Sequence, residues 1–248
     1  MFPDFKGTES KSPDTSNFIQ RLKAAVPNAT LVTILNGPNT DELWDIAAHC
    51  IDHGLVPVIS TDPRGLLGAF VTGYEFLGGK YPDSPIVRLD TAEHPPEFIP
   101  ELLQELEQYE MVIGDLDFAA GNHLIHNSVD EFAHRDLFPM LFSLFTHGKL
   151  KLSCAHGFQA FRSGWGAAFI LKAALRIVGS VEHSEDEVLT WGLDGAMALG
   201  AIARAYKTVV HPVPSESVRN RETRKVAHQT DNALRMLIAA RVAYPTVF

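Results

Sequence analysis

Short apolar runs alternate with helical patterns through the first half of the chain, and this alternation constrains the fold more than any other feature. The predicted strands are ATLVTIL, LVPVIST, SPIVRLD and MVIGDLD. One of the predicted helices between them, ELWDIAAHCIDH, follows the capping residues Thr40 and Asp41 and stops near Gly54. Strands that alternate with helices predict a mainly parallel sheet with helices on both faces, a three-layer α/β/α fold.

The rest of the chain extends this domain without a visible linker. A helix interrupted at Pro139, a turn at GFQAFRSG leading into an apolar helix, and a last helix from about Glu222 to Arg241 are expected in the second half. Residues 1–16 are polar and rich in Ser, Thr, Pro and Asp. We therefore expect a flexible lead-in over 1–16 and one domain over 17–248.

Composition and charge exclude several classes of function. The net charge of −9 makes binding to nucleic acid unfavourable. Cys50 and Cys154 stand in apolar surroundings without CxxC spacing, which indicates reduced buried thiols. The sequence has no signal peptide and no apolar run long enough to cross a bilayer, so a cytoplasmic location is expected. Motifs of P-loop, dinucleotide-binding and serine-hydrolase sites are absent.

Carboxylates gather directly after the predicted strands. In open α/β sheets, ligands bind beyond the carboxyl ends of the strands. The segments that follow them are Asn36 to Asp41, Thr61 to Gly65, Asp90 to His94 and Asp115 to Asp117. We therefore expect a polar ligand site there.

A basic cluster near the C-terminus stands out in this acidic chain. It comprises Arg219, Arg221, Arg224 and Lys225, and it follows the predicted strand KTVVHPVP. Arginine suits phosphate because its planar guanidinium bonds two oxygens at once. A solvated helix start with ion pairs to Glu216 and Glu222 explains the same residues without a ligand.

Several of these motifs together resemble glycosyltransferase family 2. The stretches IVRLDTAEHPPEFIPELLQEL, MVIGDLDF, GFQAFRSG and AYKTVVHPVP have the order and approximate spacing found in that family. The polyprenyl (dolichyl) phosphate mannosyltransferase branch is most similar, with its DADLQHPPE and SGFRAFR motifs. The resemblance runs from about Thr30 to the C-terminus. It implies a GT-A fold, a nucleotide-diphosphate sugar donor and inverting transfer of a hexose to a hydroxyl or phosphate acceptor.

The resemblance also implies a divalent metal, Mn or Mg, that neutralises the leaving nucleoside diphosphate. Asp90 would be its first ligand, with Glu93 in place of the family's second aspartate and His94 as a weaker candidate. The chain departs from the family here, because it lacks the DxD pair. Alternatively, Asp90 caps the following turn and binds no metal.

Further site residues come from the same resemblance. The expected contacts to the donor or to phosphate, in addition to Arg219, Arg221 and Arg224, are Asn36, Arg64, Gly65, Gly68, Arg135 and Arg162. The expected acceptor-side or general-base carboxylates are Asp115, Asp117, Glu185, Asp186 and Asp194. Each of these acids also has an ordinary alternative as a capping or ion-pairing group.

Asn36 stands where the family has a base-contacting acid, and the family's first strand is not recognisable in this chain. Base recognition is therefore expected to be altered or lost. These departures favour a competing hypothesis, a noncatalytic binding or scaffold protein that keeps the GT-A fold; a nucleotidyltransferase on a related sheet is a more distant third. A lipid-linked phosphate acceptor would be met at the membrane surface. The small-residue helix Gly195 to Ala205 could pack internally or form a homo-oligomer.

Overall fold

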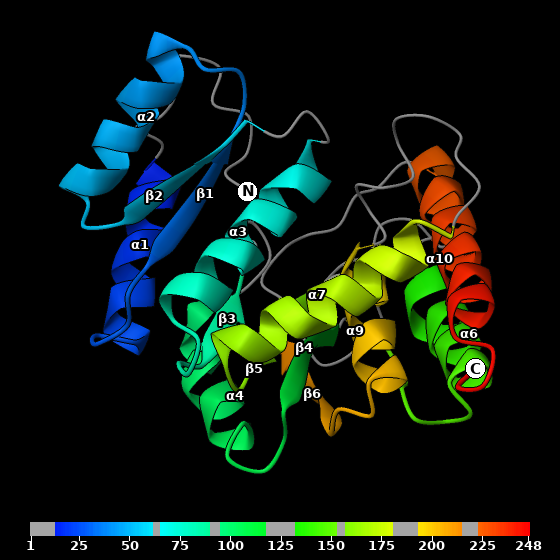
Figure 1. Ribbon diagram of the computed structural model, residues 1–248. Coiled ribbons are helices and arrows are strands. Elements are labelled where there is room, and N and C mark those ends of the chain that lie inside the picture. Colours follow the sequence, from blue (N-terminus) through cyan, green and yellow to red (C-terminus); the bar gives the residue numbers. More distant parts are fainter. Residues whose placement is uncertain are drawn as a thin grey trace.

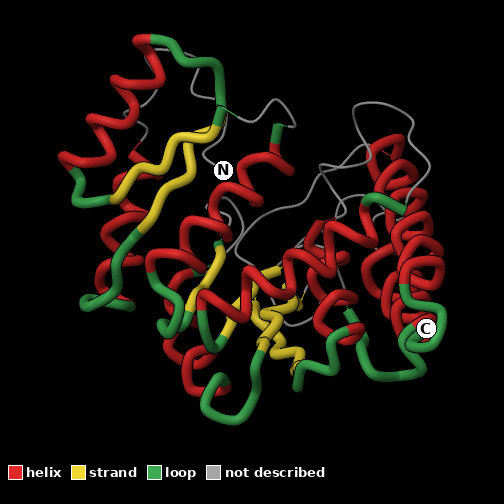
Figure 2. Tube along the Cα trace, in the orientation of Figure 1, coloured by secondary structure: helices red, strands yellow, loops and turns green. Residues whose placement is uncertain are grey.

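The chain forms an α/β protein in which helices surround two small sheets (Figure 1). The computed structural model describes residues 13–61, 65–89, 95–117, 132–152, 157–180, 193–214 and 223–248. Figure 2 shows two separate groups of strands, one near the centre of the molecule and one toward its upper left, with helices beside each.

Most predicted elements are confirmed, with shifted ends. The helices are α1 (Pro13–Ala25), α2 (Asp41–Asp52), α3 (Leu66–Lys80), the 3₁₀ turn η1 (Pro96–Phe98), α4 (Ile99–Glu105), the π-helical turn η2 (Ala133–Leu137), α6 (Phe138–Phe145), α7 (Gly164–Val178), α9 (Leu193–Ala203) and α10 (Thr223–Ala243). The strands are β1 (Val32–Asn36), β2 (Val56–Ser60), β3 (Ile86–Arg88), β4 (Met111–Asp117), β5 (Gly157–Phe161) and β6 (Thr208–Pro214). α1 begins at Pro13, inside the flexible lead-in that the sequence predicts over 1–16.

The strands form a two-stranded and a four-stranded sheet, and the parallel arrangement is only partly as expected. β1 pairs with β2 in parallel, and the larger sheet has the order β3-β5-β4-β6. β4 and β6 are parallel, whereas β5 runs antiparallel to both β3 and β4. The prediction of a turn at GFQAF is wrong, because residues 157–161 form β5. This segment has two strand-favouring phenylalanines but no β-branched residue, and it is the strand that lies between β3 and β4.

Helices cover both faces of the four-stranded sheet. On one face, Val112 and Ala160 pack with Leu22 of α1 and Leu102 of α4. The other face holds the largest core, which receives apolar side chains from α3, α6, α7, α9 and α10. Phe161 on β5 is fully buried there.

Two helices connect the sheets. α1 places Ile19 against the core of the smaller sheet and Leu22 against the larger one. α3 packs so closely on β1 that a Cβ at Gly73 would lie 3.0 Å from Ile34 Cγ1, while Tyr74 on the same helix contacts Phe161 edge-on. The sheets therefore share a helix on each side, although no described strand joins them.

Small residues let the helices above the larger sheet approach one another. A Cβ at Gly164 of α7 would lie 2.7 Å from the carbonyl oxygen of Leu77, and one at Gly200 of α9 would lie 3.1 Å from the Ala174 nitrogen. Ala196 and Ala201 of α9 are fully buried. The small-residue helix thus packs internally against α7.

Capping side chains and left-handed residues mark the ends of α2 and α9, and the sequence predicts those of α2. The Leu43 N–H donates to Thr40 Oγ1 at the start of α2, and Gly54 ends the helix at φ +66°, both as predicted. α9 ends in the same pattern, in which the Tyr206 N–H donates to the Ala201 carbonyl, but its left-handed residue is Ala205 at φ +57°. An alanine in this conformation is strained.

Cys50 is buried, as predicted, and burial raises the pKa of its thiol. Cys154 lies outside the described residues.

Replacing Ala205 by glycine should stabilise the protein by about 0.5–1 kcal/mol, because relief of the left-handed strain outweighs the extra flexibility of the unfolded chain. The matched change Gly54→Ala, at the corresponding end of α2, should destabilise it by about 1 kcal/mol. Urea unfolding measures both values. A loss of stability in the glycine variant would contradict this account of the α9 end.

Candidate functional site

The carboxyl ends of β3, β4 and β6 meet at one edge of the larger sheet, here called the carboxyl edge. These strands point the same way, because β3 and β4 are both antiparallel to β5. β5 begins at this edge, where Gly157 pairs with Asp115. The residues that follow β3 and β4 therefore leave the sheet on the same side.

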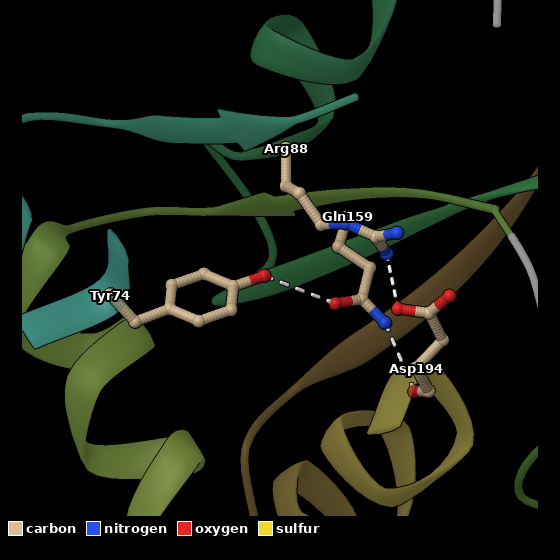
Figure 3. Close-up of polar contacts among 4 residues, drawn as sticks. All are labelled: Tyr74, Arg88, Gln159 and Asp194. Atoms are coloured by element: carbon tan, nitrogen blue, oxygen red, sulfur yellow. Dashed lines mark hydrogen bonds and ion pairs between the residues drawn. The ribbon is translucent and has the colours of Figure 1, made fainter. Parts of the chain in front are cut away.

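A polar network of four side chains lies below this edge, on the face of the sheet that α3 and α9 cover (Figure 3). Arg88 Nη1 on β3 donates to Asp194 Oδ1 at the start of α9, forming an ion pair. Gln159 Nε2 on β5 donates to the Asp194 carbonyl at 3.0 Å, and Tyr74 on α3 donates its hydroxyl to Gln159 Oε1 at 3.3 Å. The network thus joins two strands to two helices.

Burial makes these contacts mutually dependent. Gln159 is 1% exposed and the Asp194 side chain 8%. Burial raises the pKa of the Tyr74 hydroxyl far above its ordinary value. Since Tyr74 stays protonated and donates to Gln159 Oε1, the Gln159 amide nitrogen is the atom left to donate to the Asp194 carbonyl.

Arg88 is held from two sides. Its guanidinium carbon lies 4.5 Å from the centre of the Phe70 ring on α3, while its Nη1 pairs with Asp194. The cation therefore has an aromatic face and a carboxylate as partners. Because Arg88 is the last residue of β3, this clamp fixes the strand end from which residues 90–94 continue.

The structure places Asp194 in its ion-pairing alternative. Asp194 Oδ1 accepts a hydrogen bond from Arg88 Nη1, and this contact competes with proton transfer to the carboxylate. Its role as a catalytic base stays a prediction.

Asn36, Gly65 and Gly68 come together at the carboxyl end of the smaller sheet. Asn36 ends β1 and donates from Nδ2 to the Gly65 carbonyl at 2.8 Å. Gly65 precedes α3 with φ +59°, and Gly68 is buried in the first turn of that helix. This grouping agrees with the proximity that the sequence predicts, although Asn36 uses its amide for a local contact.

Arg162 lies apart from the other described candidates. It follows β5, whose end pairs with the start of β4 at the opposite edge of the sheet. Arg162 Nε donates to the carbonyls of Leu106 at 2.9 Å and Tyr109 at 3.1 Å, beyond the end of α4. Arg162 thus donates to backbone carbonyls just after a helix, a structural role. The sequence did not predict this role, because it did not predict β5, which places Arg162 at this edge.

The remaining candidates are described only in part. Asp115 is buried on β4, and the backbones of Asp117, Arg135 and Arg224 lie at the end of β4, in η2 and at the start of α10. The candidates outside the described residues are Arg64, Asp90, Glu93, His94, Glu185, Asp186, Arg219 and Arg221.

Sequence reasoning missed Arg88, Gln159 and Tyr74. The available signal was a polar residue inside an apolar strand, as in IVRLD and GFQAF. Such a residue needs a buried partner, but the sequence does not say which.

In the described part of the chain, no group of three or more His, Cys, Asp or Glu side chains could hold a metal ion. The described helices include none that is long and apolar enough to span a membrane. Comparisons with models of known protein families and with curated protein sequences gave no match. The resemblance to glycosyltransferase family 2 therefore stays a prediction.

Arg88→Met should cost about 3 kcal/mol of folding free energy, because Asp194 would remain buried without its cation. Adding Asp194→Asn should cost much less than the sum of the two single changes, since the pair fails as a unit. The control Arg235→Met breaks the exposed pair with Asp231 on α10 and should cost about 0.5 kcal/mol or less. Additive losses in urea unfolding would show that Arg88 and Asp194 are not coupled.

Proposed function

We propose that the chain is a glycosyltransferase that moves a hexose from a nucleotide-diphosphate sugar to a hydroxyl or phosphate acceptor. The observation that carries the proposal is the placement of the segment LDTAEHPPE. Its first residue follows β3 at the carboxyl edge, and its prolines lead into η1 and α4 on the opposite face of the sheet from α3. Asp90 thus follows a strand at the edge where ligands of open α/β sheets bind.

The separation of the strands into a two-stranded and a four-stranded sheet supports a GT-A fold in which the first strand of the family is altered. A strand preceding α1 would lie beside β1, because strand–helix–strand units pair their strands in this way. β2 already occupies one side of β1, and β1 lies between β2 and the four-stranded sheet (Figure 1). The two sheets are therefore separated where the family's first strand, which is not recognisable in this sequence, would fit.

A metal fits the chemistry of the proposed residues. Asp90 and Glu93 offer carboxylate oxygens, the ligand type that Mg and Mn prefer, and His94 adds an imidazole nitrogen. When bound, the metal would neutralise charge on the leaving nucleoside diphosphate.

The protein's own contribution is to position these groups. Arg88 and Asp194 clamp the end of β3, two residues before Asp90. Asn36 donates to the Gly65 carbonyl directly before α3, which ties the end of β1 to the start of that helix. Both contacts reduce the freedom of the site before a donor arrives.

A noncatalytic binding protein on the same fold is the second candidate. The observation that favours it is the pairing of Asp194 with Arg88, which occupies the carboxylate otherwise available as a base. A donor would then bind without being consumed.

A nucleotide-diphosphate sugar in the presence of Mn should raise the melting temperature by about 5 °C at saturating concentration, because a ligand that binds only the folded state stabilises it. A panel of UDP- and GDP-sugars identifies the donor. The rise should disappear in Asp90→Ala and persist in Asp83→Ala, a change at an exposed aspartate between α3 and β3. Absence of any shift at millimolar donor would contradict the transferase, whereas a shift without product release in a turnover assay would favour the binding protein.

A further inference from the structure

An exposed stack of aromatic rings lies on α7 and the turn after α9. Trp165 and Phe169, one helical turn apart, lie nearly parallel, with ring centres 5.3 Å apart and an angle of 9°. Tyr206 continues the stack, with its ring centre 6.1 Å from that of Phe169. Trp165 is 61% exposed, although each ring next to it is partly buried. The Trp165 indole is therefore open to solvent while it stacks on Phe169.

One cation lies over the middle ring of the stack, and a second lies over Tyr109, a ring outside the stack. The Arg204 guanidinium carbon lies 4.7 Å from the centre of the Phe169 ring, and Lys207 Nζ lies 4.8 Å from that of Tyr109. Glu110 accepts a hydrogen bond from the Lys207 N–H at 2.9 Å. Both cations are exposed and can donate to a ligand.

The turn that presents Arg204 and Tyr206 is the strained one. Ala205 between them has φ +57°, a conformation that costs an alanine about 1 kcal/mol or more. Strain of this kind is retained where the surrounding contacts fix the backbone. Here the stacked ring of Tyr206 and the cation over Phe169 are those contacts.

This surface is separate from the candidate site described above. α7 begins after β5 ends, and Tyr206 lies just before β6 begins. Phe161 and Thr208 both pair with Met111 at the start of β4, so the stack lies at the amino edge of the sheet. A ligand here would leave the carboxyl edge free.

The size of the surface limits its partner. The exposed part of Trp165 amounts to roughly 150 Å², far below the roughly 800 Å² that each partner buries in a stable protein interface. A membrane-binding helix would need a longer apolar face than this ring, which the cations and Glu110 interrupt. Nucleic acid is disfavoured by the net charge of −9 and by Glu110 beside the stack.

A saccharide matches what remains. The C–H face of a hexose is flat and apolar, while its rim carries hydroxyls that both donate and accept hydrogen bonds. The exposed indole offers a flat apolar face, while Arg204 over Phe169 and Tyr206 at the end of the stack offer groups that can hydrogen-bond to hydroxyls. We propose that Trp165, Phe169, Tyr206 and Arg204 form a saccharide-binding surface, with a hexose ring stacked on the Trp165 indole.

The proposal does not depend on the transferase activity, and its test uses different ligands. Maltohexaose and cellohexaose are titrated to about 10 mM, above the millimolar dissociation constants expected of a single stacked ring. Backbone amide NMR signals of Phe169, Tyr206 and Lys207 should shift saturably with at least one of them. The shifts should persist in Trp44→Ala, which removes the other described tryptophan, 55% exposed on α2.

Trp165→Ala should weaken binding at least tenfold, and Trp165→Phe should weaken it less, because a smaller ring still stacks. Arg204→Gln should weaken it a few-fold. Unchanged amide spectra away from the stack confirm that each variant is folded. The proposal is overturned if neither hexasaccharide gives a saturable shift, if Trp165→Ala binds as well as the unmodified chain, or if AMP binds there and the saccharides do not.

Discussion

The buried pair of Arg88 and Asp194 is the interaction on which the arrangement of the carboxyl edge depends. Removing two charges from water is costly, and their attraction offsets that cost only when the geometry and the remaining hydrogen bonds are good. Phe70 and Gln159 supply these additional contacts, and Tyr74 holds Gln159 in place. A pair of this kind contributes more to the relative placement of β3, β5, α3 and α9 than to net stability.

The sequence predicted those parts of the fold that local chemistry determines. Thr40 and Gly54 mark the ends of α2 because capping and left-handed residues act within one turn. β5 was missed because its strand character depends on neighbours that are distant in sequence. The π-helical turn at Ala133–Leu137 was foreseen only as an interruption near Pro139. Missing β5 also made the predicted strand directions partly wrong, because β5 is the antiparallel strand of the larger sheet.

The positions of the candidate site residues were likewise predictable only where they depend on the order of neighbouring strands and helices. Asn36 ends β1 and Gly65 comes shortly after β2, and the two meet because these strands are parallel neighbours, as the alternation of strands and helices predicts. Arg162 was assigned to phosphate from its motif, yet it bonds carbonyls beyond α4 at the other edge. The partners of Arg88 and Gln159 could not be predicted, because they come from helices far along the chain. The motif GFQAFR thus indicates which residues are present, while the direction of β5 decides at which edge of the sheet Arg162 lies.

We propose a metal-assisted donor site at the carboxyl edge, which Asp90 follows in the sequence. Paramagnetic broadening by Mn in the presence of a GDP- or UDP-sugar tests it most directly, because the effect falls steeply with distance from the ion. The account predicts selective broadening of the amide signals of Leu89 and Asp115, with those of Phe161 and Thr208 at the amino edge little affected. Uniform broadening, or broadening centred on the amino edge, would contradict it.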